Sequence, residues 1–387
     1  MRKEGWQRVM ERRRMKKSDL LPSLLGFGCM RFPLTPEGKI DEAEAERMLD
    51  RAIAGGVNYL DTAYPYLGRE SEPFMGRYLK KRERTSLYLA TKMPVWMVSS
   101  LEEAKNLFAE QLKRLQTDYI DFYLLHALDK EEWDKALRLG IVDYFEEQRR
   151  AGVIKNFGFS FHDSYEVFEE IVNSRDWDFC QIQLNYMDID IQAGMRGYKL
   201  AEQKGLPLVI MEPVKGGTLA GFAEDIMSLF RSLDEKASAA SFALRWVGSL
   251  PGVKVILSGM STMEQVEDNL ATFTDFNPLS EKEQETIERI REILRSRTQN
   301  GCTGCEYCMP CPAGVNIPGN FSVWNTYHMY QNYNIVARRW EVGLGDKAQA
   351  KKCVQCGKCE KACPQRISIR EDLKKVQQDL DRKEMCY

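Results

Sequence analysis

The chain has 387 residues, of which 43% are hydrophobic and 29% charged, and its formal net charge is -2. This length suits a barrel of about 250 residues followed by a smaller unit, and the hydrophobic content suffices for a large core. The near-neutral charge gives no overall field that would attract nucleic acid or an anionic membrane. No run approaches the ~18 apolar residues of a membrane span. We therefore expect a cytoplasmic protein that binds neither nucleic acid nor membrane.

The first stretch of the chain, MRKEGWQRVMERRRMKK, is locally basic. No apolar stretch long enough for a secretory signal follows these charges. We expect residues 1–23 to form an N-terminal basic segment that is solvated.

Short β-type runs then alternate with longer amphipathic segments, which is the pattern of parallel strands joined by helices. The expected strands are residues 24–29, 58–62, 87–91, 120–125, 154–160, 179–184, 206–211 and 253–257. Eight such repeats predict an α/β fold, a (β/α)8 TIM barrel, over residues 24–276.

The remaining chain contains three further helical patterns. One lies within residues 277–300, which we expect to be a linker helix, and the others cover residues 317–340 and 370–382. Residues 301–387 are therefore expected to form a small, mainly helical domain that is held together by metal.

Polar residues stand where three successive expected strands end, which is the catalytic end of such a barrel. Asp61 and Tyr66 lie in YLDTAYPYLGRE, Lys92 in YLATKMP, and His126 in FYLLHAL. Each has a bland explanation alone: a helix cap, a surface phenol, a solvated lysine or a packed histidine. Because the chain has only three histidines, the four residues together favour a catalytic site.

The segments LGFGCMR, YLDTAYPY, ATKMP, LLHAL, GFSFHDS and QIQLNY resemble, in this order, those of the aldo/keto reductase family. The resemblance covers about residues 24–276 and implies a catalytic tetrad. Tyr66 would protonate the substrate oxygen as hydride reaches the carbonyl carbon, and the Lys92 ammonium would favour its phenolate. Asp61 would hold Lys92, and His126 would orient the carbonyl. The spacing from Asp61 favours Tyr66 over the neighbouring Tyr64.

The resemblance also implies a bound nicotinamide dinucleotide. The matching positions are Ser160, Gln181, Met211, Gly216, Gly217, Ser258, Gly259, Gln265, Asp268 and Asn269. Phe161 replaces an Asn that often grips the carboxamide, and His162 is close enough to substitute. Met211 stands where an aromatic residue often stacks on the nicotinamide.

Gly259 and Gln265 occupy positions where relatives often carry the basic residues that bind an adenosine 2'-phosphate. A dianionic phosphate without such a partner binds poorly. NAD is therefore at least as good a candidate as NADP, unless Lys215 or Lys254 compensates.

Eight of the eleven cysteines fall into two runs between Cys302 and Cys363. The second run has the spacing two, two, three followed by proline, as in bacterial ferredoxins, and the first run is one residue shorter in its last gap. Two 4Fe-4S clusters are expected, with the fourth cysteine of each run crossing to the other cluster. One set is Cys302, Cys305, Cys308 and Cys363, and the other is Cys353, Cys356, Cys359 and Cys311.

Alternative interpretations apply to the remaining candidates. A pair of structural zinc sites is the other explanation for the cysteine runs, although zinc has no use for a third Cys followed by Cys-Pro. Cys29, Cys180 and Cys386 are given no role, and His328 is expected to pack. Trp96, in the loop after Lys92, is either an apolar wall of the substrate pocket or a contact for the second domain.

Hydride carries two electrons, whereas each cluster accepts one. We expect an oxidoreductase that exchanges hydride between NAD(P)H and a small carbonyl or alcohol, with clusters that exchange electrons with a partner protein or brace their domain. Two alternatives stay open. Clusters could feed single electrons to a flavin or radical in the barrel, although the chain has no flavin motif. In the second alternative the protein is a sensor or electron carrier that turns over no substrate, and the retained tetrad argues against it.

Overall fold

The computed structural model describes residues 9–15 and 19–382. The chain divides into two compact units. One contains the described residues as far as Gly216 together with Ser241–Leu279, and the other contains Gly217–Ala240 and the described residues from Ser280 onward. Within residues 9–15 and 19–382, no helix combines the length and apolar character needed to cross a bilayer.

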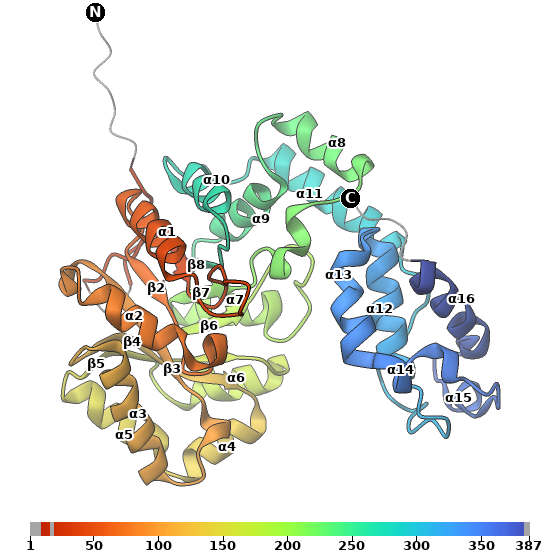
Figure 1. The fold of residues 1–387 in the computed structure, drawn as a ribbon, viewed down its shortest axis with the longest axis horizontal. Helices are drawn as coiled ribbons and strands as arrows, with labels where there is room; N and C mark the ends of the chain where they lie inside the picture. The colour runs from red at the N-terminus through yellow and green to blue at the C-terminus, as the bar shows by residue number, and fades with distance from the viewer. Residues whose placement is uncertain (1–8, 16–18, 383–387) are drawn as a thin grey trace, which may run out of the picture. The chain divides into compact units, whose positions relative to one another are not determined.

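The first unit is a closed barrel of eight parallel strands in sequential order (Figure 1). The strands are β1 (Leu25–Gly28), β2 (Tyr59–Asp61), β3 (Tyr88–Met93), β4 (Ile120–Leu128), β5 (Ile154–Phe161), β6 (Phe179–Gln183), β7 (Leu208–Met211) and β8 (Val253–Ser258). The barrel closes where β1 pairs with β8, with Leu25 opposite Ile256. The predicted (β/α)8 fold is confirmed.

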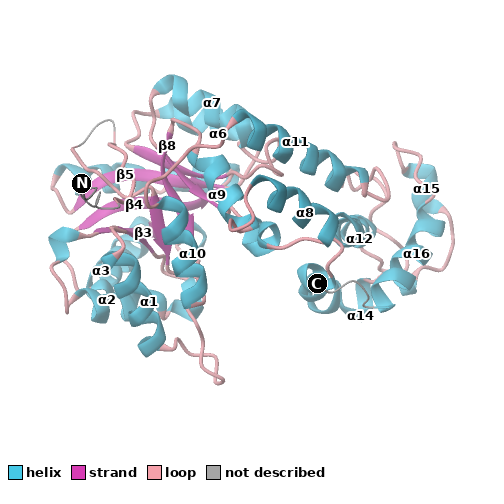
Figure 2. Ribbon diagram, turned by 90° about the horizontal axis from the view of Figure 1, so that it is seen from above, coloured by secondary structure: helices cyan, strands magenta, loops and turns pink. Residues whose placement is uncertain are grey.

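Helices connect the strands and surround them, as the cyan segments around the magenta strands in Figure 2 show. They are α1 (Glu42–Ala54), α2 (Ser71–Leu79), α3 (Leu101–Leu115), α4 (Lys130–Arg138), α5 (Ile141–Arg150), α6 (Tyr165–Ser174), α7 (Gly194–Lys204), α9 (Ala239–Gly248) and α10 (Met263–Phe273). Local sequence fixes several starts: the Ser100 side chain accepts from the Glu103 backbone N–H at α3, as capping requires.

Aromatic side chains fill the barrel interior. The Phe122 ring lies 5.0 Å from that of Tyr59 and 5.2 Å from that of Phe179, measured between centroids. Val209 and Val255 belong to the same buried cluster. Because this interior is packed, it is not a pore, and chemistry is left to the loops at the strand ends.

The expectation of a solvated N-terminal segment is wrong for Met10 and Met15, which are buried, whereas Val9, Arg12 and Arg14 are exposed. Met15 is 2% exposed and packs with the residues of the barrel interior. Its backbone N–H donates to Leu20, and that of Arg13 donates to Pro22, so the chain folds back on itself. The Arg13 guanidinium donates to backbone carbonyls at Gly248 and Val253. Basic residues of this segment therefore contact the barrel through backbone groups, which the charge of the segment did not predict. Residues 1–8 and 16–18 lie outside the described residues.

The second unit is helical. Its helices are α8 (Glu224–Leu233), α11 (Glu281–Ser296), α12 (Ile317–Tyr330), α13 (Tyr333–Arg338), α14 (Gly345–Ala348), α15 (Lys358–Ala362) and α16 (Ile369–Arg382). Two of them, α12 and α16, supply most of the apolar core, including Trp324 and Leu373. A Ser280–Glu283 capping box starts α11.

The bounds of the units differ from the predicted domain bounds at residues 217–240. We expected this stretch within the barrel domain, whereas the structure groups it with the second unit. The Phe222 ring centroid lies 6.2 Å from that of Tyr330, and Asp225 forms an ion pair with Arg297. These contacts join residues far apart in sequence, so no local pattern signals them.

Candidate active site and metal centres

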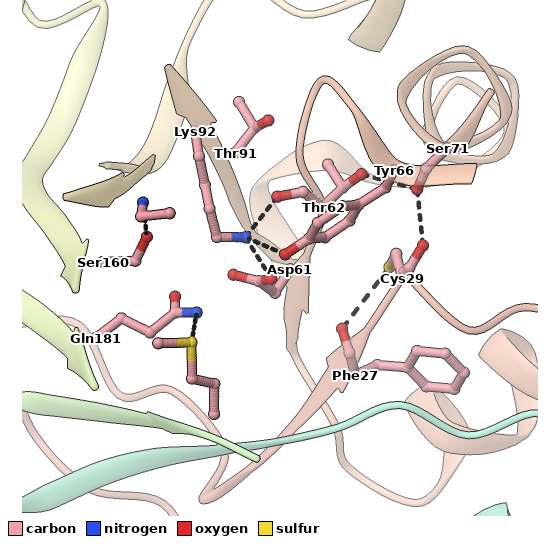
Figure 3. Close-up of polar contacts among 12 residues, drawn as sticks. Phe27, Cys29, Asp61, Thr62, Tyr66, Ser71, Thr91, Lys92, Ser160 and Gln181 are labelled. Carbon is pink, nitrogen blue, oxygen red and sulfur yellow. Dashed lines mark hydrogen bonds and ion pairs between the residues drawn. The ribbon is translucent and has the colours of Figure 1, made fainter. Parts of the chain in front are cut away.

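Lys92 lies at the centre of the polar cluster at the C-terminal end of the strands (Figure 3). Its Nζ lies 2.6 Å from Asp61 Oδ1, 2.8 Å from the Thr62 carbonyl oxygen and 3.3 Å from the Tyr66 hydroxyl. The Lys92 side chain is fully buried. The structure thus brings three of the four predicted tetrad residues into direct contact.

Burial and the neighbouring charges shift the pKa values of this cluster in opposite directions. Burial lowers the pKa of Lys92, but Asp61 and Tyr66 outweigh it, so the pKa is raised and Lys92 is an ammonium. Burial raises the pKa of Asp61, and Lys92 offsets part of that rise. Burial likewise raises the pKa of Tyr66, because the lowering effect of Lys92 is smaller. The expected net lowering of the Tyr66 pKa is therefore not found, and the phenol is protonated, as a general acid must be.

His126, the fourth predicted tetrad residue, lies beside the phenol. Its ring centroid lies 5.9 Å from that of Tyr66 and 5.0 Å from that of Trp96. Burial, helped by Lys92 and His162, holds the pKa of His126 well below its usual value, so the imidazole is neutral. Its Nδ1 is buried without a hydrogen-bond partner among the described residues.

Tyr64, the competing phenol, points elsewhere. Its hydroxyl donates to Glu110 Oε2 at 3.2 Å, and its ring lies beneath the Arg114 guanidinium. It is therefore held by helix α3 and not by Lys92.

An open cavity lies beside the cluster. It is lined by Gly28, Met30, Arg31, Asp61, Tyr66, His126, Ser160, His162, Gln181, Met211, Glu212, Leu257 and Gly259. Strand ends from across the barrel therefore meet around one space, which is how this fold builds active sites.

Three predicted cofactor positions lie at consecutive strand ends on this cavity. The Ser160 hydroxyl accepts from the Ala127 backbone N–H at 2.7 Å. Gln181 Nε2 lies 3.5 Å from Met211 Sδ, while Gln181 Oε1 is buried without a partner among the described residues (Figure 3). A buried amide oxygen without a partner can accept from a bound ligand.

The predicted cofactor-binding positions around β8 have different surroundings. Gly259 lines the cavity. Ser258 and Asn269 are buried and bonded to each other, Oγ to Nδ2, at 2.8 Å. Gln265 Oε1 accepts from the Ser261 backbone N–H at the start of α10, and Asp268 lies one turn further along that helix.

The two glycines after β7 both adopt positive φ, +63° at Gly216 and +96° at Gly217. Such backbone favours glycine. Gly216 belongs to the barrel unit, while Gly217 is the first residue of the second unit. The expected joint role for the pair stays a prediction.

The two lysines considered as partners for a 2'-phosphate each contact another group of the chain. Lys215 Nζ contacts both carboxylate oxygens of Asp188. Lys254 lies near the start of β8 and donates to the Pro251 carbonyl. Arg31 and Glu212 are cavity residues that the sequence analysis missed, although Glu212 directly follows the end of β7 and Arg31 lies three residues after the end of β1, where the strand-end rule could have found them.

The cysteines of the second unit line two cavities. Cys302, Cys305, Cys308 and Cys363 border one cavity. Cys311, Cys353, Cys356 and Cys359 border the other, which Cys308 also reaches. The described residues hold no group of three or more His, Cys, Asp or Glu side chains gathered closely enough for a single metal ion.

The remaining candidates have structural surroundings. Cys29 and Cys180 are fully buried, and burial raises the pKa of both thiols. Cys386 lies outside the described residues. His328 Nε2 lies 2.8 Å from Asp379 Oδ2, an oxygen that also accepts from the Trp324 indole. This histidine joins α12 to α16 and does not border either cysteine cavity.

Sequence comparisons cover both units. Residues 24–292 match the model of the aldo/keto reductase family, and residues 301–368 match that of a 4Fe-4S dicluster domain. Among curated proteins, the uncharacterized oxidoreductase YqkF of Bacillus subtilis is 27% identical over 67% of this chain and 90% of its own. L-galactose dehydrogenase of Arabidopsis thaliana is 23% identical over 74% of this chain and 94% of its own.

Two solved structures are similar in fold. The aldo-keto reductase AKR11C1 from Bacillus halodurans, in its holo form, aligns with a TM-score of 0.61 and 29% identity over 72% of this chain and 96% of its own. An aldo-keto reductase from Klebsiella pneumoniae in complex with NADPH aligns with a TM-score of 0.59 and 22% identity over 73% of this chain and 95% of its own.

Proposed function

Because the chain belongs to the aldo/keto reductase family and carries a 4Fe-4S dicluster domain, we propose that it reduces a small carbonyl compound with NADH or NADPH, or runs the reverse oxidation. In addition, two clusters held by the cysteines of the second unit would exchange single electrons with a partner protein, separately from the two-electron hydride transfer. The observation that carries the proposal is the buried Lys92, held between Asp61 and the Tyr66 hydroxyl at the edge of the open cavity.

Tyr66 acts as the general acid. Its phenol is protonated because burial raises its pKa, and it donates that proton to the carbonyl oxygen as negative charge develops there. The Lys92 ammonium, 3.3 Å away, stabilises the resulting phenolate. Asp61 keeps Lys92 charged and in place.

His126 orients the carbonyl. A neutral imidazole can donate one hydrogen bond to the substrate oxygen without releasing a proton of its own. Trp96 packs against this ring and is 44% exposed, which supports the expectation that it forms an apolar wall for the substrate.

The cavity's donor and acceptor pattern fits a nicotinamide dinucleotide. Bound there, the cofactor supplies hydride to the carbonyl carbon. Gln181 Oε1, otherwise without a partner among the described residues, would accept from the carboxamide. Ser160 and His162 border the same space and would complete that grip.

The two cysteine cavities fit two clusters with crossed ligands. Each predicted set of four thiols borders one cavity, which supports Cys363 serving the first run and Cys311 serving the second. The clusters would carry one electron each. Cysteines must stay reduced to bind clusters, and a reducing compartment keeps them so; we therefore place the protein in the cytoplasm.

Deuterium transfer tests the proposal. The protein is purified without oxygen and incubated with a panel of aldehydes and ketones and with NADH or NADPH deuterated at C4 on one face. Deuterium on the carbinol carbon of a product supports direct hydride transfer, and the nucleotide that reacts faster identifies the preferred cofactor. Alcohol formed without deuterium from either labelled face would contradict it and favour single-electron chemistry.

A further inference from the structure

Arg31 follows strand β1 and borders the barrel cavity. Among the described residues that line this cavity it is the only arginine or lysine. Among the described residues no carboxylate lies within 4.0 Å of its guanidinium, unlike Lys215, which is neutralised by Asp188. A cation in such a position is available for an anionic ligand.

Two glycines make room for this side chain. A methyl group added at Gly259 would lie 3.0 Å from Arg31 Cδ and 3.2 Å from its Cγ, closer than ordinary contact. A methyl group at Gly216 would lie 3.5 Å from Arg31 Nη2. The arginine stem thus runs over the end of β8, and its guanidinium reaches the turn after β7.

The backbone of Arg31 is also fixed. The Ser261 hydroxyl donates to the Arg31 carbonyl at 2.7 Å, which joins the loop after β1 to the loop after β8. A side chain that starts from an anchored backbone loses less entropy when it binds.

We infer that the Arg31 guanidinium binds the diphosphate of the dinucleotide, and this inference rests on the proposed function. The guanidinium ends beside Gly216, which adopts positive φ and has no side chain to stand between Arg31 and a ligand. A planar guanidinium pairs with two phosphate oxygens at once. Because both nucleotides contain the diphosphate, Arg31 strengthens the binding of NADH and NADPH equally and does not select between them.

Glu212 lies on the same side. Its Oε2 is also 3.5 Å from the position of a methyl group at Gly216. A carboxylate there repels a phosphate. Removing its charge should therefore have the opposite effect to removing the charge of Arg31.

The test is equilibrium binding of NADH and of NADPH to the cluster-loaded protein, measured by calorimetry without oxygen. Arg31→Leu keeps an apolar stem and removes the charge, Arg31→Lys keeps the charge, and Glu212→Gln is the opposing variant. Iron content and circular dichroism confirm that each variant is folded. Repeating the titrations at several salt concentrations reports the charge of the contact.

We expect Arg31→Leu to weaken both nucleotides by the same factor, on the order of ten- to a hundredfold. Arg31→Lys recovers part of that loss, and Glu212→Gln tightens both nucleotides. Unchanged affinities in Arg31→Leu would overturn the inference, as would a loss confined to NADPH, which would assign Arg31 to the 2'-phosphate. Wild-type protein that binds neither nucleotide would instead remove the proposed function itself.

Discussion

Lys92 Nζ and Asp61 Oδ1 lie 2.6 Å apart with side-chain exposures of 0% and 3%, so the barrel holds a fully desolvated ion pair. Breaking such a pair by removing one partner leaves an uncompensated buried charge. Lys92→Met should therefore lower the free energy of unfolding by about 3–5 kcal/mol. Urea denaturation followed by tryptophan fluorescence, without oxygen, measures the change.

The matched control is the double variant Asp61→Asn with Lys92→Met, in which both charges are gone. It should recover most of the lost stability and none of the activity. The loss of unfolding free energy in Lys92→Met should also shrink as pH falls, because burial raises the pKa of Asp61 and the carboxyl takes up a proton. Equal instability of the single and double variants at all pH values would argue against the pair.

Neutral His126 makes stability depend on pH. The folded pKa lies well below 6.5, so the unfolded chain binds the proton first as pH falls, and stability is lost below about 6.5. One such group costs up to about 1.4 kcal/mol per pH unit. His126→Asn should lose less stability than wild type between pH 6.5 and 5.5, and the two should run parallel between pH 7.5 and 8.5. Parallel curves in the acidic range would mean that His126 is not buried neutral.

The crossed cluster assignment can be separated from the uncrossed one by a matched pair of variants. Both carry Cys302→Ala, Cys305→Ala and Cys308→Ala. Adding Cys363→Ala should leave one intact cluster, about four irons per chain, because Cys311 completes the second set. Adding Cys311→Ala instead should remove that cluster. Iron analysis and visible absorption give the answer, and the reverse result would establish uncrossed ligation.

The barrel and its tetrad could be predicted from the sequence because both follow local rules. Eight strand patterns recur along the chain, and parallel strands place their ends at one face, so Asp61, Lys92 and His126 had to meet there. The resemblance to a known family then assigned each residue a role.

Other features depend on contacts between distant residues. Met15 is flanked by basic residues on both sides, and nothing local indicates that it packs into the barrel interior. Phe222 joins the second unit only through partners such as Tyr330. The raised pKa of Tyr66 follows from its burial, which the order of residues does not reveal. Arg31 ends the segment LGFGCMR, and its place beside the cavity and over Gly259 is seen only in the structure.

The most direct test of the central claim compares two phenols two residues apart. Tyr66 contacts Lys92, whereas Tyr64 contacts Glu110. In anaerobic single-turnover reduction of a carbonyl substrate, Tyr66→Phe should slow the chemical step by about 10²- to 10⁴-fold while nucleotide affinity is kept. Tyr64→Phe should react within a few-fold of wild type. Full activity in Tyr66→Phe, or an equal loss in both variants, would contradict the assignment of Tyr66 as the general acid.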